Sequence, residues 1–283
     1  MDVAPGNLHA FRMSAAGAIL CVDGGVGDHM QDLLNVAPLV ALALGVFASL
    51  LLAGALGRRL GKGLGKPDGT EQGHVLSGIL SLLALLIAFT FGLALDRYEL
   101  RRELVVQEAN AIGTAAMRVR LLDTPHAQRL AKTYLDYAEV RLNYGLAQYG
   151  DKPPLRKASR ELRARLQAQT LEALAAIRQS AQAGYTLSAV NDSLDIGVAR
   201  EAAQDARLPS AVLMALAVYA IATAVALGAT LRGHRAMSTL MFLLLTLALG
   251  IIVDLDQPRA GGITVSQDAM ARLVADLRSA PAP

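Results

Sequence analysis

The stretch AFTFGLALDRYELRRELVVQEANAIG, residues 88–113, decides the architecture of this chain. Its first half is apolar enough for the interior of a lipid bilayer, and its second half is densely charged. No proline separates the two halves, so nothing in the stretch breaks a helix. The stretch therefore predicts one helix that leaves a membrane and continues into water.

The composition of the whole chain agrees with a membrane location. Of the 283 residues 53% are hydrophobic and 18% are charged, and the mean hydropathy is +0.38. Soluble domains rarely reach this value, so a membrane protein with the lipid bilayer as its surroundings is expected. The formal net charge of +3 is too small to indicate nucleic-acid binding. The single cysteine, Cys21, excludes an intrachain disulfide framework.

Four apolar runs have a length that suits membrane crossing. A bilayer core of about 30 Å takes about 20 helical residues. Backbone polar groups in lipid must bond within their own segment, so each run is predicted to be a helix. The runs are residues 36–56, 75–95, 211–231 and 237–253.

The order of these runs predicts an all-α membrane protein with a helical extramembrane domain inserted between helices two and three. The expected divisions are a poorly ordered leader at 1–35, a first transmembrane hairpin at 36–95, the helical domain at 96–208, a second hairpin at 209–253 and an acidic C-terminal segment at 254–283. Within the inserted domain, a helix is expected to end near Ala183, and the last helix to lead into the third span at Pro209. The insert is rich in Ala, Leu, Arg, Glu and Gln, which favour helices.

The cell (inner) membrane is the expected location, with an orientation that two arguments leave open. The short loops carry Arg58, Arg59, Lys62 and Lys66, which by the positive-inside rule face the cytoplasm and leave the insert outside. Further arginines, among them Arg97 and Arg101, border the membrane on the other side and weaken this bias.

The long second helix separates into two faces at about 100° per residue. One face is mainly apolar and also carries Arg97, Arg101 and Glu108. Its other members are Ile79, Leu82, Leu86, Thr90, Leu93, Leu100, Leu104, Ala111, Ala115, Val119 and Leu122. A buried carboxylate needs a partner, so Glu108 is expected either to pair with an arginine of a neighbouring helix or to face a wet conduit.

The other face is built from small residues in the membrane and from acids beyond it. Its members are Ser77, Gly78, Ser81, Leu85, Ala88, Phe89, Gly92, Asp96, Glu99 and Glu103. Small side chains at this spacing favour close helix packing or a pore-lining surface.

Three acids are expected at one membrane face. Asp96 follows the second span, while Asp254 and Asp256 follow the fourth, and with four spans both exits lie on the same side. Together with Arg97 and Arg259 these carboxylates suggest an electrostatic latch, or an ion-binding or gating site that includes possible Ca²⁺ binding. Arg97, Arg101, Glu108 and Arg259 are predicted to form a structural charge network.

Catalytic signatures are not found in the sequence. The five histidines are scattered, and neither a zinc-binding pair, a P-loop nor a nucleophile elbow is present. We therefore expect no enzyme and no resident cofactor.

The segments FTFGLALDRYELRRELVVQEANAIGTA and ALGIIVDLDQPRAGGITVSQ resemble the bestrophin-like domain family of multi-pass membrane proteins. The chain is more distantly similar to bestrophins. Their second helix also exits through an aromatic residue and an Asp-Arg-aromatic triplet, as Phe89 and Asp96-Arg97-Tyr98 do here. Their fourth helix also exits into acids followed by a proline, as Asp254, Asp256 and Pro258 do here.

The resemblance implies a pentameric, anion-selective channel for inorganic ions, lined by the second helices. Carried over, the hydrophobic neck falls at Ser81, Leu85 and Phe89, next to Gly92. Ser81 is polar where bestrophins are apolar, and the acids below Gly92 fit poorly with anion selectivity. A channel for cations or divalent ions, and a non-conducting scaffold or sensor, are the alternatives.

Overall fold

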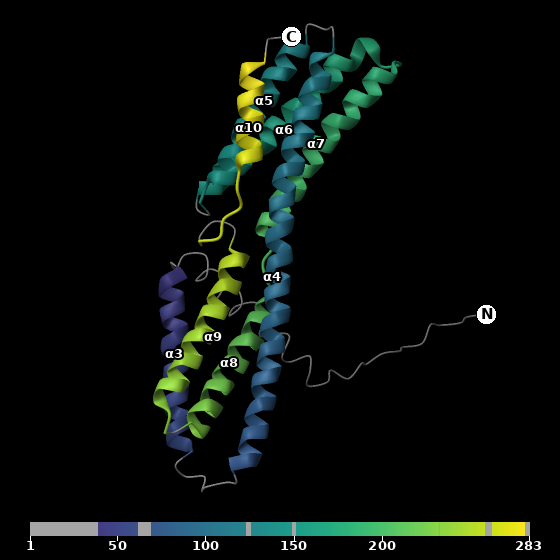
Figure 1. The fold of residues 1–283 in the computed structure, drawn as a ribbon. Helices are drawn as coiled ribbons and strands as arrows, with labels where there is room; N and C mark the ends of the chain where they lie inside the picture. Colours follow the sequence, from purple (N-terminus) through teal and green to yellow (C-terminus); the bar gives the residue numbers. More distant parts are fainter. Residues whose placement is uncertain are drawn as a thin grey trace, which may run out of the picture.

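The computed structural model describes residues 39–61, 69–122, 126–148, 151–231, 233–257 and 262–280. The predicted leader at 1–35 and Arg259 lie outside these residues. In the described parts of the chain the secondary structure is helical, and four helices are long and apolar enough to cross a membrane. Figure 1 shows one helix, α4, running the full height of the molecule beside two groups of shorter helices.

The four membrane-crossing helices were predicted in the correct order, and their bounds shift by a few residues. The fourth span, short in the sequence, gains a turn because its helix continues through its terminal aspartates. The observed bounds are α3 Leu39–Leu60, α4 Gly69–Arg120, α8 Ser210–Thr230 and α9 Arg235–Asp256.

The helices α3 and α8 approach closely because glycines face each other. A Cβ atom on Gly57 would lie 2.0 Å from the Val225 carbonyl oxygen, and one on Gly228 would lie 2.1 Å from the Gly54 carbonyl oxygen. Contacts of this kind let two backbones pack without side chains between them, as is common in membrane bundles. Phe242 of α9 fills the remaining space and is fully buried.

The predicted continuous helix is present as α4, with 52 residues. At 1.5 Å per residue it is about 78 Å long. Its buried face lies further round the helix than the sequence indicated. Leu82, Leu93 and Leu100 of the mainly apolar face are exposed, while Leu83 and Ala94 are buried. The neighbours of α4 cover a narrower sector than its apolar residues occupy.

The inserted region contains three further helices beside the upper half of α4 (Figure 1). They are α5 Ala127–Leu146, α6 Lys152–Leu174 and α7 Ala181–Asp205. Of these, α5 and α7 pack on α4, and α6 packs on α5 and α7. The break expected near Ala183 lies earlier, at residues 178–180. There the Ser180 hydroxyl accepts a hydrogen bond from the Ala183 N–H and caps α7.

The inserted region joins the third span without a continuous helix. The helix α7 ends at Asp205, residues 206–209 are not helical, and α8 begins at Ser210. Pro209 cannot donate a backbone hydrogen bond, so the chain restarts its helix there. Among the described residues, α4 is the one helix that runs unbroken through both helix groups.

The C-terminal segment contains a helix that the sequence analysis missed. Helix α10 (Asp268–Ser279) packs against α4 and α5, and its Met270 and Val274 are buried in the core of the upper group. The signal was present as a strongly amphipathic pattern, apolar at 270, 273, 274 and 277.

Candidate functional site

A continuous exposed stripe runs along α4 from its membrane half into its upper half. The stripe residues recur every three or four positions, so they share one face of the helix. We call this the exposed stripe; all its members are exposed except Gly92, which is half-buried. It comprises Gly78, Ser81, Leu85, Phe89, Gly92, Asp96, Glu99, Glu103, Gln107, Asn110, Thr114 and Met117. It contains no basic residue.

The residues predicted to line a pore all lie on this stripe. Ser81 is exposed, and Leu85 and Phe89 expose 53% and 66% of their surface. A Cβ atom on Gly92 would meet no other atom within 4 Å. The small residues here therefore do not serve close packing within the chain, and this face of α4 is free for a pore or for another subunit.

The acids of the stripe are free of ion pairs with described residues. Asp96, Glu99 and Glu103 are exposed, and Glu103 only accepts a hydrogen bond of 2.8 Å from the Gln107 side chain. An ordinary surface carboxylate on an Arg-rich helix would find a cation three or four residues away. Here Arg101 points into the protein and Arg97 is half-buried, while the exposed Arg102, three residues after Glu99, forms no ion pair with it. The acids of the stripe therefore have no ion-paired cation among the described residues.

Asp254 and Asp256 do not join Asp96. Both are 7% exposed, whereas Asp96 is exposed on the other side of α4's exit. Asp256 accepts a 3.0 Å hydrogen bond from the Leu208 N–H and lies 3.9 Å from Arg101. Asp254 accepts one of 3.2 Å from the Ile263 N–H. The expected cluster of three acids is therefore wrong, because α9 turns its acids inward.

Both aspartates are thus buried and accept hydrogen bonds from backbone N–H groups, and Asp254 Oδ1 has no hydrogen-bond partner among the described residues. No group of three or more His, Cys, Asp or Glu side chains able to hold a metal is found among the described residues. Ca²⁺ binding near the two aspartates stays a prediction.

Arg101 joins three helices at the level where α4 leaves the membrane bundle. Its guanidinium donates to the carbonyl oxygens of Ala203 at 3.1 Å, Ala206 at 2.8 Å and Leu255 at 3.2 Å. These oxygens belong to the C-terminal ends of α7 and α9, where carbonyls lack helical partners and the helix dipole favours a cation. Arg97 is half-buried beside it.

Glu108 lies at the centre of a second, fully buried charge network. Its Oε1 accepts a 2.5 Å hydrogen bond from Arg141 Nε, and its Oε2 pairs with Arg200 Nη1. All three side chains are 0% exposed. The network of Glu108 is separate from that of Arg101, so the single charge network predicted for both is wrong.

Arg141 of α5 holds this network together. Besides Glu108 it donates to Glu201 at 2.5 Å and to the Gly197 carbonyl at 2.9 Å. Burial by itself lowers the pKa of Arg141, but the attraction of Glu108 and Glu201 outweighs it and raises the pKa above its ordinary value. Burial and the nearby Arg141 lower the pKa of Arg200, which pairs with Glu108.

Two glycines make room for the network. A Cβ atom on Gly197 would lie 2.4 Å from the Tyr137 hydroxyl, and one on Gly145 would lie 2.1 Å from Gln267 Oε1. Burial raises the pKa of Tyr137 to about 12, so its hydroxyl stays neutral beside Glu108. The sequence analysis missed Arg141. It continues the three- to four-residue spacing of the buried residues Leu130, Tyr134 and Tyr137.

The comparisons with known proteins agree with this architecture. A family model described as Bestrophin-like domain matches residues 40–270. No curated protein sequence gave a match.

Solved structures resemble the whole fold. A crystal structure of a bacterial bestrophin homologue from Klebsiella pneumoniae, carrying an isoleucine-to-threonine mutation, superposes with a TM-score of 0.61 at 14% identity, covering 85% of this chain and 99% of that one. A leucine-to-threonine mutant of this bacterial homologue gives 0.59 at 14% identity, covering 86% and 99%. A membrane protein with a proline-to-alanine mutation gives 0.60 at 13% identity, also covering 86% and 99%. At these identities the similarity establishes the fold.

Proposed function

Because this chain belongs to the bestrophin-like domain family, we propose that it is the subunit of a homo-oligomeric ion channel whose conduit is lined by α4. The observation that carries the proposal is the exposed stripe. It is continuous over both halves of one helix, from Gly78 to Met117. A surface that only faced lipid would have no reason to continue, unpaired and acidic, beyond the membrane.

The stripe supplies the parts of a conduit in order. Ser81, Leu85, Phe89 and Gly92 line the membrane half, with Phe89 as the largest side chain at the neck. Apolar constrictions gate pores by excluding water. The region 96–208, together with α10, forms the extramembrane domain around the upper part of the conduit. Since α4 is one rigid helix, a movement of this domain is transmitted to the neck.

The charges of the stripe favour cations as the conducted ions. In an oligomer, Asp96, Glu99 and Glu103 each form a ring of carboxylates, and such rings select cations. The resemblance to bestrophins favours anions, and the acidic stripe is the observation against it. A pentamer in the inner membrane, as in the family expectation, is the assembly we propose.

Reconstitution of the purified full chain tests both parts of the proposal. In planar bilayers with a KCl gradient, we expect currents whose reversal potential is shifted from zero toward the equilibrium potential of K⁺. Replacing the three acids together by Asn and Gln should move it toward zero. A reversal potential shifted toward the equilibrium potential of Cl⁻ would refute the proposed cation selectivity and leave the channel proposal standing. Proteoliposomes without ion flux under varied pH, calcium and membrane tension would refute the channel.

A further inference from the structure

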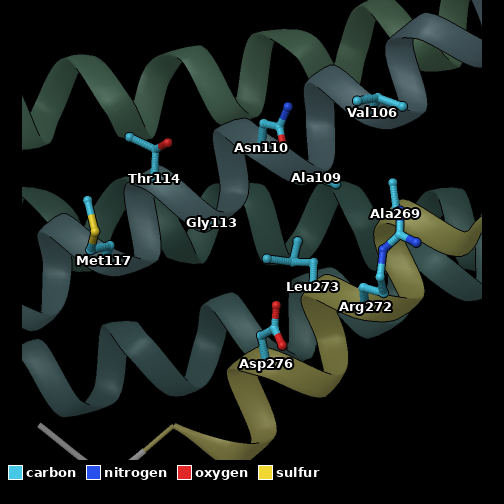
Figure 2. A pocket seen from close by; sticks show the side chains of 10 residues that line it. All are labelled: Val106, Ala109, Asn110, Gly113, Thr114, Met117, Ala269, Arg272, Leu273 and Asp276. Carbon is cyan, nitrogen blue, oxygen red and sulfur yellow. The ribbon is translucent and has the colours of Figure 1, made fainter.

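A groove flanks the exposed stripe on the side of α10. It has a volume of about 600 Å³, and it lies between the upper half of α4 and the outward side of α10. Figure 2 shows Asn110, Thr114 and Met117 on α4 and Arg272 and Asp276 on α10 around this space. Its lining is largely apolar or small, with Arg272 and Asp276 as its charged members.

The opposite side of the stripe is bordered by α7. Arg118 Nη1 donates to the Tyr185 carbonyl at 2.5 Å, and Arg101 donates to the Ala203 carbonyl. Gly113 lies next to Leu273 of α10, and Glu108 pairs with Arg200 of α7. At 100° per residue, Gly113 and Glu108 lie on opposite sides of the stripe. In any ring with α4 facing the axis, the α10 side of one copy therefore faces the α7 side of the next.

These two sides carry opposite charges without partners in the described chain. Arg272 of α10 is exposed and forms no ion pair with a described residue, not even with Asp276 one turn later. On α7, Asp192 and Asp195 are exposed, one turn apart, and equally unpaired among described residues. In contrast, Arg278 of the same α10 binds Glu139 at 2.7 Å within the chain.

The two sides also lie at the same height along α4. Leu273, next to Arg272, lies at Gly113. Asp192 lies between Tyr185, which contacts Arg118, and Arg200, which contacts Glu108. Both therefore fall at the level of α4 residues 108–118. Rotation about a ring axis preserves height, so in such a ring the charges of adjacent copies lie at the same level.

We infer that the groove between α4 and α10 receives the α7 side of an adjacent copy of this chain, with Arg272 of one copy paired with Asp192 and Asp195 of the next. The inference rests on the proposed homo-oligomer, and it adds which surfaces join. It gives α10 a function in assembly, because α10 supplies half of the groove.

Cysteine crosslinking of the full chain tests the inference. In a Cys21→Ser background, which removes the only native cysteine, Arg272→Cys combined with Asp192→Cys should give, on mild oxidation, a ladder of linked species up to the full ring. Each single-cysteine variant is the control and should give no ladder. A double variant without any linked species, in a sample that is oligomeric by native mass spectrometry, overturns the inference but leaves the channel proposal standing.

Charge reversal gives a second test. Arg272→Glu should raise the concentration for half-assembly about tenfold, since like charges then face each other at every interface. Combining it with Asp192→Lys and Asp195→Lys should restore assembly. Arg278→Glu, on the same helix but paired within the chain, is the matched control and should leave assembly unchanged. Equal assembly of all variants refutes the inference, and a monomeric wild type refutes both proposals.

Discussion

The buried face and the exposed stripe of α4 handle charge in opposite ways. On the buried face Arg101 and Glu108 each have several partners from other helices. On the stripe Asp96, Glu99 and Glu103 have no ion pair with described residues. Buried charges are tolerated only when paired, whereas exposed ones need no partner. The difference indicates that the buried face serves the fold and that the stripe serves something outside the subunit.

The strongest test of this comparison removes the buried carboxylate. Glu108→Ala leaves Arg200 buried without a carboxylate and leaves Arg141 with Glu201 alone. We therefore expect a loss of about 3–5 kcal/mol in the free energy of unfolding. Chemical or thermal unfolding in detergent, followed by circular dichroism, measures this loss. Glu103→Ala on the stripe is the control and should change stability by less than about 0.5 kcal/mol. Equal losses in both variants would abolish the distinction between the two faces.

Arg101 gives the next largest effect. Arg101→Met keeps the length of the side chain but removes its donors, leaving the carbonyls of Ala203, Ala206 and Leu255 without this partner. We expect a loss of about 2–3 kcal/mol by the same unfolding measurement. Arg102→Met, at the exposed neighbouring position, should be nearly neutral. A neutral Arg101→Met would mean that the helix ends are held by other contacts.

The glycine beside Glu108 sharpens the comparison further. Gly197→Ala forces a methyl group to 2.4 Å from the Tyr137 hydroxyl, and the network must shift to admit it. We expect a cost of about 1–3 kcal/mol from overpacking. Gly184→Ala in the same helix meets no atom within 4 Å and should be neutral or slightly stabilising. A lower melting temperature for Gly184→Ala than for Gly197→Ala would contradict the tight packing at the network.

The smallest effect on stability is expected on the stripe, where the functional effect should be large. Phe89→Ala removes a side chain that is 66% exposed, so the melting temperature should stay nearly constant. If Phe89 forms the neck, single-channel conductance should rise. Phe91→Ala is the control, because Phe91 is also exposed but lies off the stripe. Unchanged conductance in Phe89→Ala would exclude Phe89 from the constriction.

Much of the fold was predictable from residue patterns. The four spans follow from apolar runs of bilayer length, and the long helix follows from the missing breaker between Ala88 and Gly113. The resemblance to bestrophins placed a predicted neck at Ser81, Leu85 and Phe89, helical spacing put these residues on one face of α4, and the structure leaves that face free. Helical spacing is a local property, so a single sequence is enough to recognise it.

Other features depended on which helices meet. The sequence required a partner for Glu108 but did not name it, and the structure supplies Arg141 and Arg200, 33 and 92 residues later. The sequence analysis grouped Asp96 with Asp254 and Asp256 because all three follow spans that end on the same side of the membrane. In the structure α9 turns its two aspartates toward the protein, so they lie apart from Asp96. Helix α10 was overlooked because its two buried residues gain their stability only from α4 and α5.

The sequence by itself determined that this chain is a membrane protein with one helix continuing from the bilayer into a helical domain, because hydropathy and helix continuity are written in consecutive residues. Only the tertiary structure decided which charges are paired and which stay free. Pairing depends on distances between helices that are far apart in sequence, and a shift of one residue around a helix axis moves a side chain by about 100°. The orientation of α4 about its axis therefore decides which of its residues form the exposed stripe.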